Sequence, residues 1–324
     1  MRAEPGGVPY ATAAAFRSAL RDRLAVIAGL QGSHRLDELQ RQFAYDRLLA
    51  RVFDGPGADH WVLKGAGALL VRLPDARHSR DLDLAYSSVA DAVGSGKARV
   101  TSRESSLAEA VEVLTAAADR DLGDHFRFEI SRTTPLQEHA VGRRVDVLAY
   151  LGTRYAAFHI DVVVGTAMTG VPEQFPPLIP LRIDGLVRPP YRLFPLVDHV
   201  ADKVCAILEV HPRAGGPQPS TRVKDLVDLT LIASTQTLDG AALHTAISVG
   251  AAHRGLALSE RFTVPDLAVW RAGYPAKAAD VPGATPGFDD AVALVARFLD
   301  PILSRKPVLS WDPSHATWTS DTRD

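Results

Sequence analysis

The sequence has one cysteine and no apolar run of membrane-spanning length, and both features narrow the class of protein. Cys205 cannot form an internal disulfide, and a cysteine without a partner is typical of packing rather than of chemistry. A membrane span needs about 20 apolar residues in a row, so we expect no membrane partner. Residues Met1 to Pro5 carry no signal-peptide pattern, and we therefore expect a cytoplasmic protein.

The sequence also lacks an excess of charge of either sign. Its 36 basic and 38 acidic residues leave a formal net charge of -2. A nearly neutral chain does not attract nucleic acid broadly, so an RNA partner would need a local basic patch. The length of 324 residues is enough for two sub-domains that each bury a core.

Hydrophobic spacing and turn residues predict a mixed α/β part in residues 1–170. Helices are expected at 11–30, 36–53 and 106–120, the last capped by Ser105 or Ser106, with a polar turn at 91–96. Strands are expected at 126–132, 144–151 and 157–164. Because the links between these strands are short, we expect them to pair as antiparallel neighbours.

A proline-rich segment at 171–195 is expected to form a stiff connector, with one short strand at 181–187. Residues 196–304 predict a mainly helical sub-domain, with helices at 196–210, 221–234, 240–252, 267–272 and 288–303. The polar tail at 305–324 holds two isolated tryptophans, Trp311 and Trp318. Such a tail either docks onto the preceding helices or is disordered.

The stretch at 61–84 organises the rest of the chain, and its pattern predicts a strand, a glycine turn, a short helix, a loop and a second strand. Gly65 and Gly67 would let the backbone turn tightly and approach a bound group. Side chains alternate along a strand, so Asp81 and Asp83 share one face of the second strand.

Two carboxylates one pleat apart repel each other unless a cation lies between them. Mg²⁺ is the usual cation because it binds carboxylate oxygens and substrate phosphates together, and Mn²⁺ is an alternative. A solvent-facing strand with two charges is the simpler interpretation. The glycine turn and three nearby positive side chains favour a metal site; these side chains are Lys64, Arg77 and Arg80.

The glycine turn also partly fits a dinucleotide-binding fingerprint, in which Gly-x-Gly follows a strand and an acid follows later. The fit fails in detail. Leu70 replaces the third glycine, and Asp81 opens the second strand where the fingerprint acid closes it. We therefore set this interpretation aside.

Further charged residues stand in apolar surroundings later in the chain. Asp161 is the one acid in an apolar strand, and burial of a lone carboxylate is costly unless it is paired or bound to metal. Asp146 is its rival, although a salt bridge to Arg143 or Arg144 explains Asp146 more simply.

Lys203 and Asp225 lie at the edges of the apolar stripes of two expected helices. A lysine that extends to solvent is the simpler interpretation of Lys203. For Asp225 the simpler interpretation is an ion pair with Arg222.

Taken together, these segments resemble the nucleotidyltransferase superfamily and, within it, the AbiEii/MenT family of bacterial toxins. Members carry a Lys-Gly-Gly-Thr-Ala-Leu turn and then Arg-x-Ser-x-Asp-Leu-Asp. Residues 77–83 match the second motif in full, whereas in the turn Ala66 replaces the second glycine and Gly67 replaces the hydroxyl residue. The family also has Asp-Lys on one helix and Lys-Asp-x-x-Asp-Leu on the next, as at 202–203 and 224–229 here.

The resemblance implies an α+β fold in which a nucleotidyltransferase-like mixed sheet, flanked by helices, precedes the helical sub-domain. It implies transfer of a nucleoside monophosphate from a nucleoside triphosphate to an RNA acceptor, the tRNA 3′ end, with release of pyrophosphate. It also implies a cognate antitoxin protein. A small-molecule nucleotidyltransferase of the antibiotic-modifying kind and a non-catalytic nucleotide-binding protein are the alternatives.

The resemblance also implies roles for individual residues. Asp81 and Asp83 would hold Mg²⁺, and Asp161 would complete the metal site or act as base. Lys203 would neutralise the triphosphate, and Asp225 would orient Lys203 or the nucleotide. The residues expected to bind the nucleotide are Lys64, Gly65, Gly67, Ser79 and Arg80.

Overall fold

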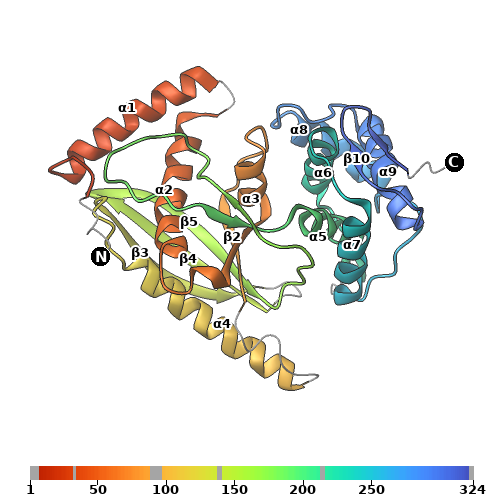
Figure 1. Cartoon of the computed structure of the whole chain (residues 1–324), viewed down its shortest axis with the longest axis horizontal. Helices are drawn as coiled ribbons and strands as arrows, with labels where there is room; N and C mark the ends of the chain where they lie inside the picture. Colours follow the sequence, from red (N-terminus) through yellow and green to blue (C-terminus); the bar gives the residue numbers. More distant parts are fainter. Residues whose placement is uncertain (1–6, 32–33, 88–96, 137–140, 212–215, 321–324) are drawn as a thin grey trace. The chain divides into compact units, whose positions relative to one another are not determined.

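The computed structural model describes residues 7–31, 34–87, 97–136, 141–211 and 216–320, with the backbone alone at residue 31 and at 97–101. The chain forms two compact units (Figure 1). Unit 1 comprises Met1–Pro74, His78–Thr166 and Pro172–Leu193, and unit 2 comprises Asp75–Arg77, Ala167–Val171 and Phe194–Asp324. The polar turn expected at 91–96 lies outside the described residues. The four-part division expected from the sequence stays a prediction.

Unit 1 is built on a seven-stranded mixed sheet with the order β3-β4-β5-β2-β1-β7-β6. The strands are β1 (Trp61–Lys64), β2 (Asp81–Tyr86), β3 (Phe126–Pro135), β4 (Gly142–Leu151), β5 (Thr153–Val164), β6 (Glu173–Phe175) and β7 (Tyr191–Leu193). β2 pairs with β5, and β1 with β7, in parallel; the other neighbours are antiparallel. The antiparallel pairing expected for the strands now labelled β3, β4 and β5 is confirmed.

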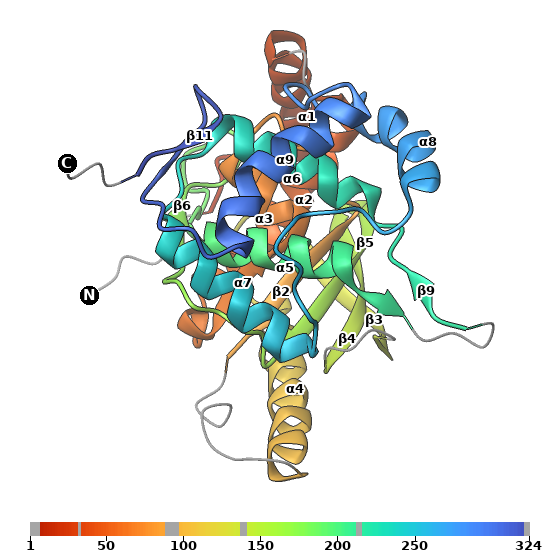
Figure 2. The same cartoon turned by 90° about the vertical axis from the view of Figure 1, so that its right-hand side faces the viewer.

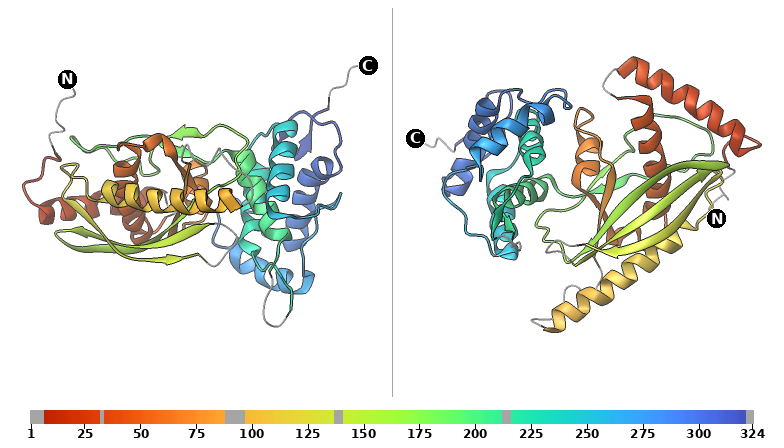
Figure 3. Two further views of the ribbon diagram at one scale, coloured as in Figure 1. Left: turned by 90° about the horizontal axis from the view of Figure 1, so that it is seen from below. Right: turned by 180° about the vertical axis from the view of Figure 1, so that it is seen from behind.

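In the part of unit 1 that the structure describes, the α-helices are α1 (Ala13–Gln31), α2 (Leu36–Phe53), α3 (Gly65–Arg72) and α4 (Lys97–Ala118). Figure 3 shows α4 lying across one face of the strands β3 to β5. The core fills this face, because the alternating residues Leu82 and Leu84 of β2 and Ile160 and Val162 of β5 are fully buried. The alternate residues of these strands lie on the opposite face and form the candidate site.

Two expectations for unit 1 are wrong. α4 begins at Lys97, and Ser106 is a buried residue inside the helix rather than a cap. The stretch at 97–105 contains no glycine or proline, so nothing in it stops the helix from extending. No strand forms at 181–187, where Gly185 turns the chain at φ 74°. The proline-rich segment instead supplies β6 and β7 on either side of this turn.

Unit 2 is mainly helical, as expected. Its helices are α5 (Leu196–Leu208), α6 (Val223–Thr235), α7 (Gly240–Arg254), α8 (Leu267–Ala278) and α9 (Phe288–Leu303). It also has two pairs of short strands: β8 (Val210–His211) pairs with β9 (Gln218–Pro219), and β10 (Trp311–Asp312) pairs with β11 (Thr317–Trp318). α6 packs against α5, α8 and α9 (Figure 2). None of the helices that the structure describes is long and apolar enough to cross a membrane.

The C-terminal tail docks, which decides between its two expected states. The indole of Trp311 is fully buried and donates a hydrogen bond of 2.7 Å from Nε1 to the carbonyl oxygen of Ala233. Trp318 stacks on Phe298 with the ring planes 3° apart, and its Nε1 donates to the Phe298 carbonyl oxygen. The hairpin formed by β10 and β11 is therefore held on the helices of unit 2.

Candidate active site

The glycine turn between β1 and α3 is shaped around the carboxylate of Asp83. Gly65 has φ 60°, a conformation that favours glycine. A Cβ at Gly65 would lie 1.9 Å from Oδ2 of Asp83, so a side chain there would displace the carboxylate. Gly65 also begins α3, and the positive end of a helix dipole favours a nearby carboxylate.

The other two small residues of the turn have more room. Ala66 is buried inside α3. A Cβ at Gly67 would meet only Cδ1 of Leu63 and Cδ2 of Leu82, each at 3.7 Å, which is ordinary van der Waals contact. The space at Gly67 therefore accepts a side chain, whereas the space at Gly65 does not.

Three acids lie on the open face of two neighbouring strands. β2 and β5 pair with Asp83 opposite Asp161 and with Asp81 opposite His159. The side chains of Asp81 and Asp161 are 37% and 18% exposed. Among the described residues, no three acidic, histidine or cysteine side chains are grouped so that they could hold a metal ion. The strands therefore align the acids, but Asp161 does not close a three-carboxylate cluster.

Arg144 explains the position of the Asp161 side chain. Arg144 lies opposite Asp161 in the pairing of β4 with β5 and donates two hydrogen bonds of 2.8 Å to its carboxylate. Its Nη2 lies 3.9 Å from Oδ2 of Asp81. The hydrogen bonds that Arg144 donates to Asp161, and the charges of Asp161, Asp81 and Asp83, raise the pKa of Arg144. A guanidinium therefore offsets part of the negative charge at the point where a metal ion was expected, and sequence reasoning did not select this residue.

Asp146 has a different partner from the one expected. Its Oδ1 lies 2.7 Å from Nδ1 of His159, the residue opposite it on β5. The expected salt bridge of Asp146 to Arg143 or Arg144 is therefore wrong, because the guanidinium of Arg144 binds Asp161.

Three residues expected to bind the nucleotide surround the acids in the sheet. Lys64 is buried at the end of β1 and pairs with Asp83 across the strands. The hydroxyl of Ser79 accepts a hydrogen bond of 3.3 Å from the backbone N–H of Asp81. The side chain of Arg80 is exposed, and its carbonyl oxygen accepts a bond of 2.7 Å from the Tyr45 hydroxyl on α2. Tyr45 therefore anchors the start of β2.

In unit 2, Lys203 is the centre of a buried network of charges. Its Nζ lies 2.5 Å from Asp228 and 3.2 Å from Asp225. Its side chain is 6% exposed, so the expectation of a lysine extending to solvent is wrong. The network gives Lys203 two carboxylate partners, of which sequence reasoning had considered only Asp225.

Two arginines complete the network. Arg222 binds Asp225 at 2.6 Å, as the simpler interpretation of Asp225 expected, and Arg77 binds Asp228 at 3.1 Å. Burial raises the pKa of Asp228, but Lys203 and Arg77 outweigh it and hold this pKa at about 2. The pKa of Asp225 is lowered in the same way by Lys203 and Arg222. Three cations thus surround two carboxylates, and the network keeps a positive charge.

Comparison with known proteins decides the family. The family described as nucleotidyl transferase AbiEii toxin of a type IV toxin–antitoxin system matches residues 47–294, which is more than half of the chain. The chain belongs to the AbiEii family. The AbiEii match covers β1 to β7 and most of unit 2, including both motif regions. No curated protein sequence gives a significant match.

Solved structures resemble this AbiEii protein over most of its length. MenT4, a nucleotidyltransferase toxin from Mycobacterium tuberculosis H37Rv, is 18% identical, covers 88% of this chain and 98% of its own, and gives a TM-score of 0.48. JHP933 from Helicobacter pylori is 14% identical, covers 86% of each chain and gives a TM-score of 0.35.

Membership of the AbiEii family makes this chain a nucleotidyltransferase and a toxin of a toxin–antitoxin system, with a nucleotide substrate and a cognate antitoxin. Nucleotidyltransferases of this kind generally use divalent metals. Asp81 and Asp83 suit one such ion, since Mg²⁺ is usually bound by one or two carboxylates together with substrate phosphates. Asp161 fits less well as a third ligand, because Arg144 already binds both of its oxygens.

Proposed function

We propose that this AbiEii-family enzyme transfers a nucleoside monophosphate from a nucleoside triphosphate to the 3′ end of tRNA, in a Mg²⁺-dependent reaction that releases pyrophosphate. The observation that carries the proposal is the placement of Asp81 and Asp83 on one face of β2, with the Asp83 carboxylate against the glycine turn. This arrangement is what a phosphate-bound metal ion requires of the protein.

In the proposed reaction a 3′-hydroxyl oxygen of the RNA attacks the α-phosphorus. The bond to the oxygen that bridges to the β-phosphate breaks, and the hydroxyl proton is lost to solvent or to a carboxylate. When bound by Asp81 and Asp83, Mg²⁺ would offset the negative charge of the phosphates. The chain itself supplies position and charge more than covalent chemistry.

Asp161 is proposed to act through Arg144. Both oxygens of Asp161 already accept charge-assisted hydrogen bonds from Arg144, so the geometry favours a positioning role for Asp161 over proton transfer. Arg144 is 40% exposed and can offer its remaining N–H groups to a phosphate. Arg144 would then be a cation that Asp161 holds in place beside Asp81.

The network around Lys203 is proposed to supply positive charge for the triphosphate. Lys203 is paired with two carboxylates, so the excess positive charge of the network lies on Arg77 and Arg222. The side chains of these arginines are 21% and 41% exposed. Asp225 would keep Lys203 and Arg222 oriented.

The test is to incubate the protein with each α-labelled nucleoside triphosphate, Mg²⁺ and total tRNA, and to separate RNA from small molecules. Label on RNA is expected, and Asp81→Asn should abolish it, whereas Asp22→Asn on the exposed surface of α1 should not. Label that stays on small molecules would support the antibiotic-modifying alternative. Absence of label from every product would contradict nucleotidyl transfer.

A further inference from the structure

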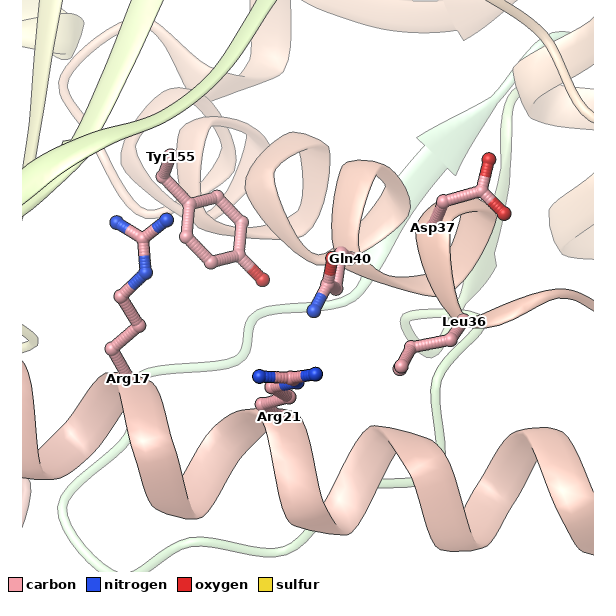
Figure 4. Close-up of a pocket in the computed structure, with 6 residues that line it drawn as sticks. All are labelled: Arg17, Arg21, Leu36, Asp37, Gln40 and Tyr155. Carbon is pink, nitrogen blue, oxygen red and sulfur yellow. The ribbon is translucent and has the colours of Figure 1, made fainter.

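A pocket of about 500 Å³ lies between α1, α2 and the start of β5, within unit 1 (Figure 4). It is lined by Arg17, Arg21, Leu36, Asp37, Gln40 and Tyr155. None of these residues belongs to the motifs of the nucleotidyltransferase site. None lies on the face of β2 and β5 that carries Asp81, Asp83 and Asp161, which is called the acid face below.

Tyr155 places a buried hydroxyl at this pocket. Its ring packs edge-on against Phe126 in the core, with 5.2 Å between the ring centroids, and burial raises the pKa of the hydroxyl. The hydroxyl oxygen is buried, yet within the described part of the chain it has no hydrogen-bond partner. A buried polar group without a partner is rare and costly, so this hydroxyl indicates a place for a bound group.

Arg17 fixes one wall of the pocket. Its guanidinium lies over the Tyr155 ring, 5.3 Å from the centroid, and its Nη1 donates to three backbone carbonyl oxygens and one hydroxyl at the turn between β4 and β5. These bonds hold α1 against the end of the sheet. The wall that carries the Tyr155 hydroxyl is therefore tied to α1.

Two more donors converge on the same space. Figure 4 shows the Tyr155 hydroxyl and the Gln40 amide on the side of the pocket that faces the Arg21 guanidinium. Across the residues that the structure describes, neither Arg21 nor Gln40 has a hydrogen bond or ion pair. Asp37, the one acid of the lining, is paired with Arg35 at 3.2 Å, which compensates its charge. A cation and an amide N–H thus remain available together, beside the buried Tyr155 hydroxyl.

These donors suit a phosphate group. Donors that approach from separate directions match a tetrahedral anion, and arginine is the usual residue for phosphate recognition. The pocket is larger than one phosphate, and Leu36 and the Tyr155 ring, at opposite ends of it, offer apolar surface to the sugar and base of a nucleotide. We propose that this pocket binds a phosphate group of a nucleotide, either free or within an RNA chain.

The pocket is separate from the acid face. Asp161 follows Tyr155 by six residues on β5, which is roughly 20 Å along a strand. The pairing of β4 with β5 shifts between Ala149 and Tyr150, and the strand bulges at Tyr155. As a result Tyr155 packs into the core, whereas Asp161 alternates with the buried residues Ile160 and Val162 and lies on the opposite face. The inference therefore goes beyond the proposed catalytic function.

The test is calorimetric titration of the full chain with inorganic phosphate, AMP and a short single-stranded RNA, in EDTA so that the metal-dependent site stays empty. Arg21→Gln and Tyr155→Phe should each weaken binding about tenfold, which corresponds to the loss of one charge-assisted hydrogen bond. The matched controls are Arg23→Gln on the same helix and Tyr150→Phe on the neighbouring strand, and neither should change the affinity.

The three probes distinguish the sources of the phosphate. Binding of AMP that depends on Arg21 supports a free nucleotide, and binding of RNA alone with the same dependence supports an RNA backbone. Tyr155→Phe should keep or raise the melting temperature of the free protein, since it removes a buried hydroxyl without a partner, and this excludes misfolding as the cause of weaker binding. Affinities that are equal in wild type and in both variants, or no binding of any probe, would overturn the proposal.

Discussion

At the scale of single residues, the two glycines of the turn have different reasons to be there. Gly65 is needed for its positive φ and for the Asp83 carboxylate that fills the space of a Cβ. Gly67 has neither constraint, and a helix interior favours alanine over glycine. The geometry of the turn therefore requires glycine at Gly65 but not at Gly67.

Gly65→Ala should destabilise the protein by about 1–3 kcal/mol and abolish nucleotidyl transfer, because alanine is strained at this φ and pushes Asp83 aside. Gly67→Ala is the matched control, and it should change the free energy of unfolding by less than about 1 kcal/mol. Urea denaturation of both variants measures the difference. Equal destabilisation by the two substitutions would contradict the role assigned to Gly65.

Arg144 gives a second prediction at this scale. Arg144→Gln removes the cation that binds Asp161 and lies beside Asp81, so the metal-free protein should lose about 1 kcal/mol of stability, as expected for a bidentate pair that is partly exposed. Added Mg²⁺ should raise the melting temperature more in this variant than in wild type, because the ion then replaces the guanidinium. Arg143→Gln, one residue earlier, is the control and should respond like wild type. A variant whose response to Mg²⁺ is no larger would refute the neutralising role.

At the scale of elements, the pairing of β4 with β5 shows where sequence reasoning ends. Period-two alternation was enough to place Asp81 and Asp83 on one face. Counting outward from the turn at Gly152 pairs Arg144 with Ile160, and only the bulge at Tyr155 shifts Arg144 opposite Asp161. A bulge depends on tertiary packing, so the ion pair could not be read from the sequence.

The other elements divide in the same way. Helices with strong apolar periodicity, such as α2 and α9, begin and end where the sequence predicted them. The start of α4 and the two strands of the proline-rich segment depend on weak local signals, and both were missed. Asp228 was also missed as a site residue. Its partner Lys203, which it shares with Asp225, lies on α5, whereas both acids lie on α6.

The charge network that joins α5 and α6 should make unit 2 sensitive to acid. The folded-state pKa of Asp228, about 2, is below its ordinary value near 3.8, so its stabilising contribution is full above about pH 4 and is lost as the pH falls toward 2. Asp228→Asn should lower the free energy of unfolding by about 3 kcal/mol at pH 7, because Lys203 then has one carboxylate partner fewer. The free energy of unfolding of this variant should also fall less between pH 4 and pH 2 than that of wild type. Urea denaturation at pH 7, 4 and 3 measures both. A variant as acid-sensitive as wild type would contradict this assignment.

The same network affects how a Lys203→Ala variant can be interpreted. Replacing this buried lysine leaves two buried carboxylates with fewer counter-charges, so Lys203→Ala is expected to lower stability as well as activity. Loss of activity in that variant would not separate catalysis from folding. Asp81 is the better position, because its side chain is 37% exposed and removing its charge relieves repulsion from the other acids.

At the scale of the whole molecule, one reaction is proposed. Unit 1 brings two carboxylates to a glycine turn, unit 2 holds a network with excess positive charge, and the AbiEii match spans both. The central claim is that the protein adds a nucleotide to the end of an RNA. Loss of Asp81 should reduce the rate by about a hundredfold or more, since one charge interaction in a transition state contributes roughly 3 kcal/mol.

The most direct measurement is the intact mass of one purified tRNA after incubation with the protein, Mg²⁺ and each nucleoside triphosphate in turn. The account predicts a mass increase of one or more nucleoside monophosphate units, located at the 3′ end by nuclease mapping, with Asp81→Asn leaving the mass unchanged. An unchanged tRNA mass with wild-type protein and all four triphosphates would contradict the claim.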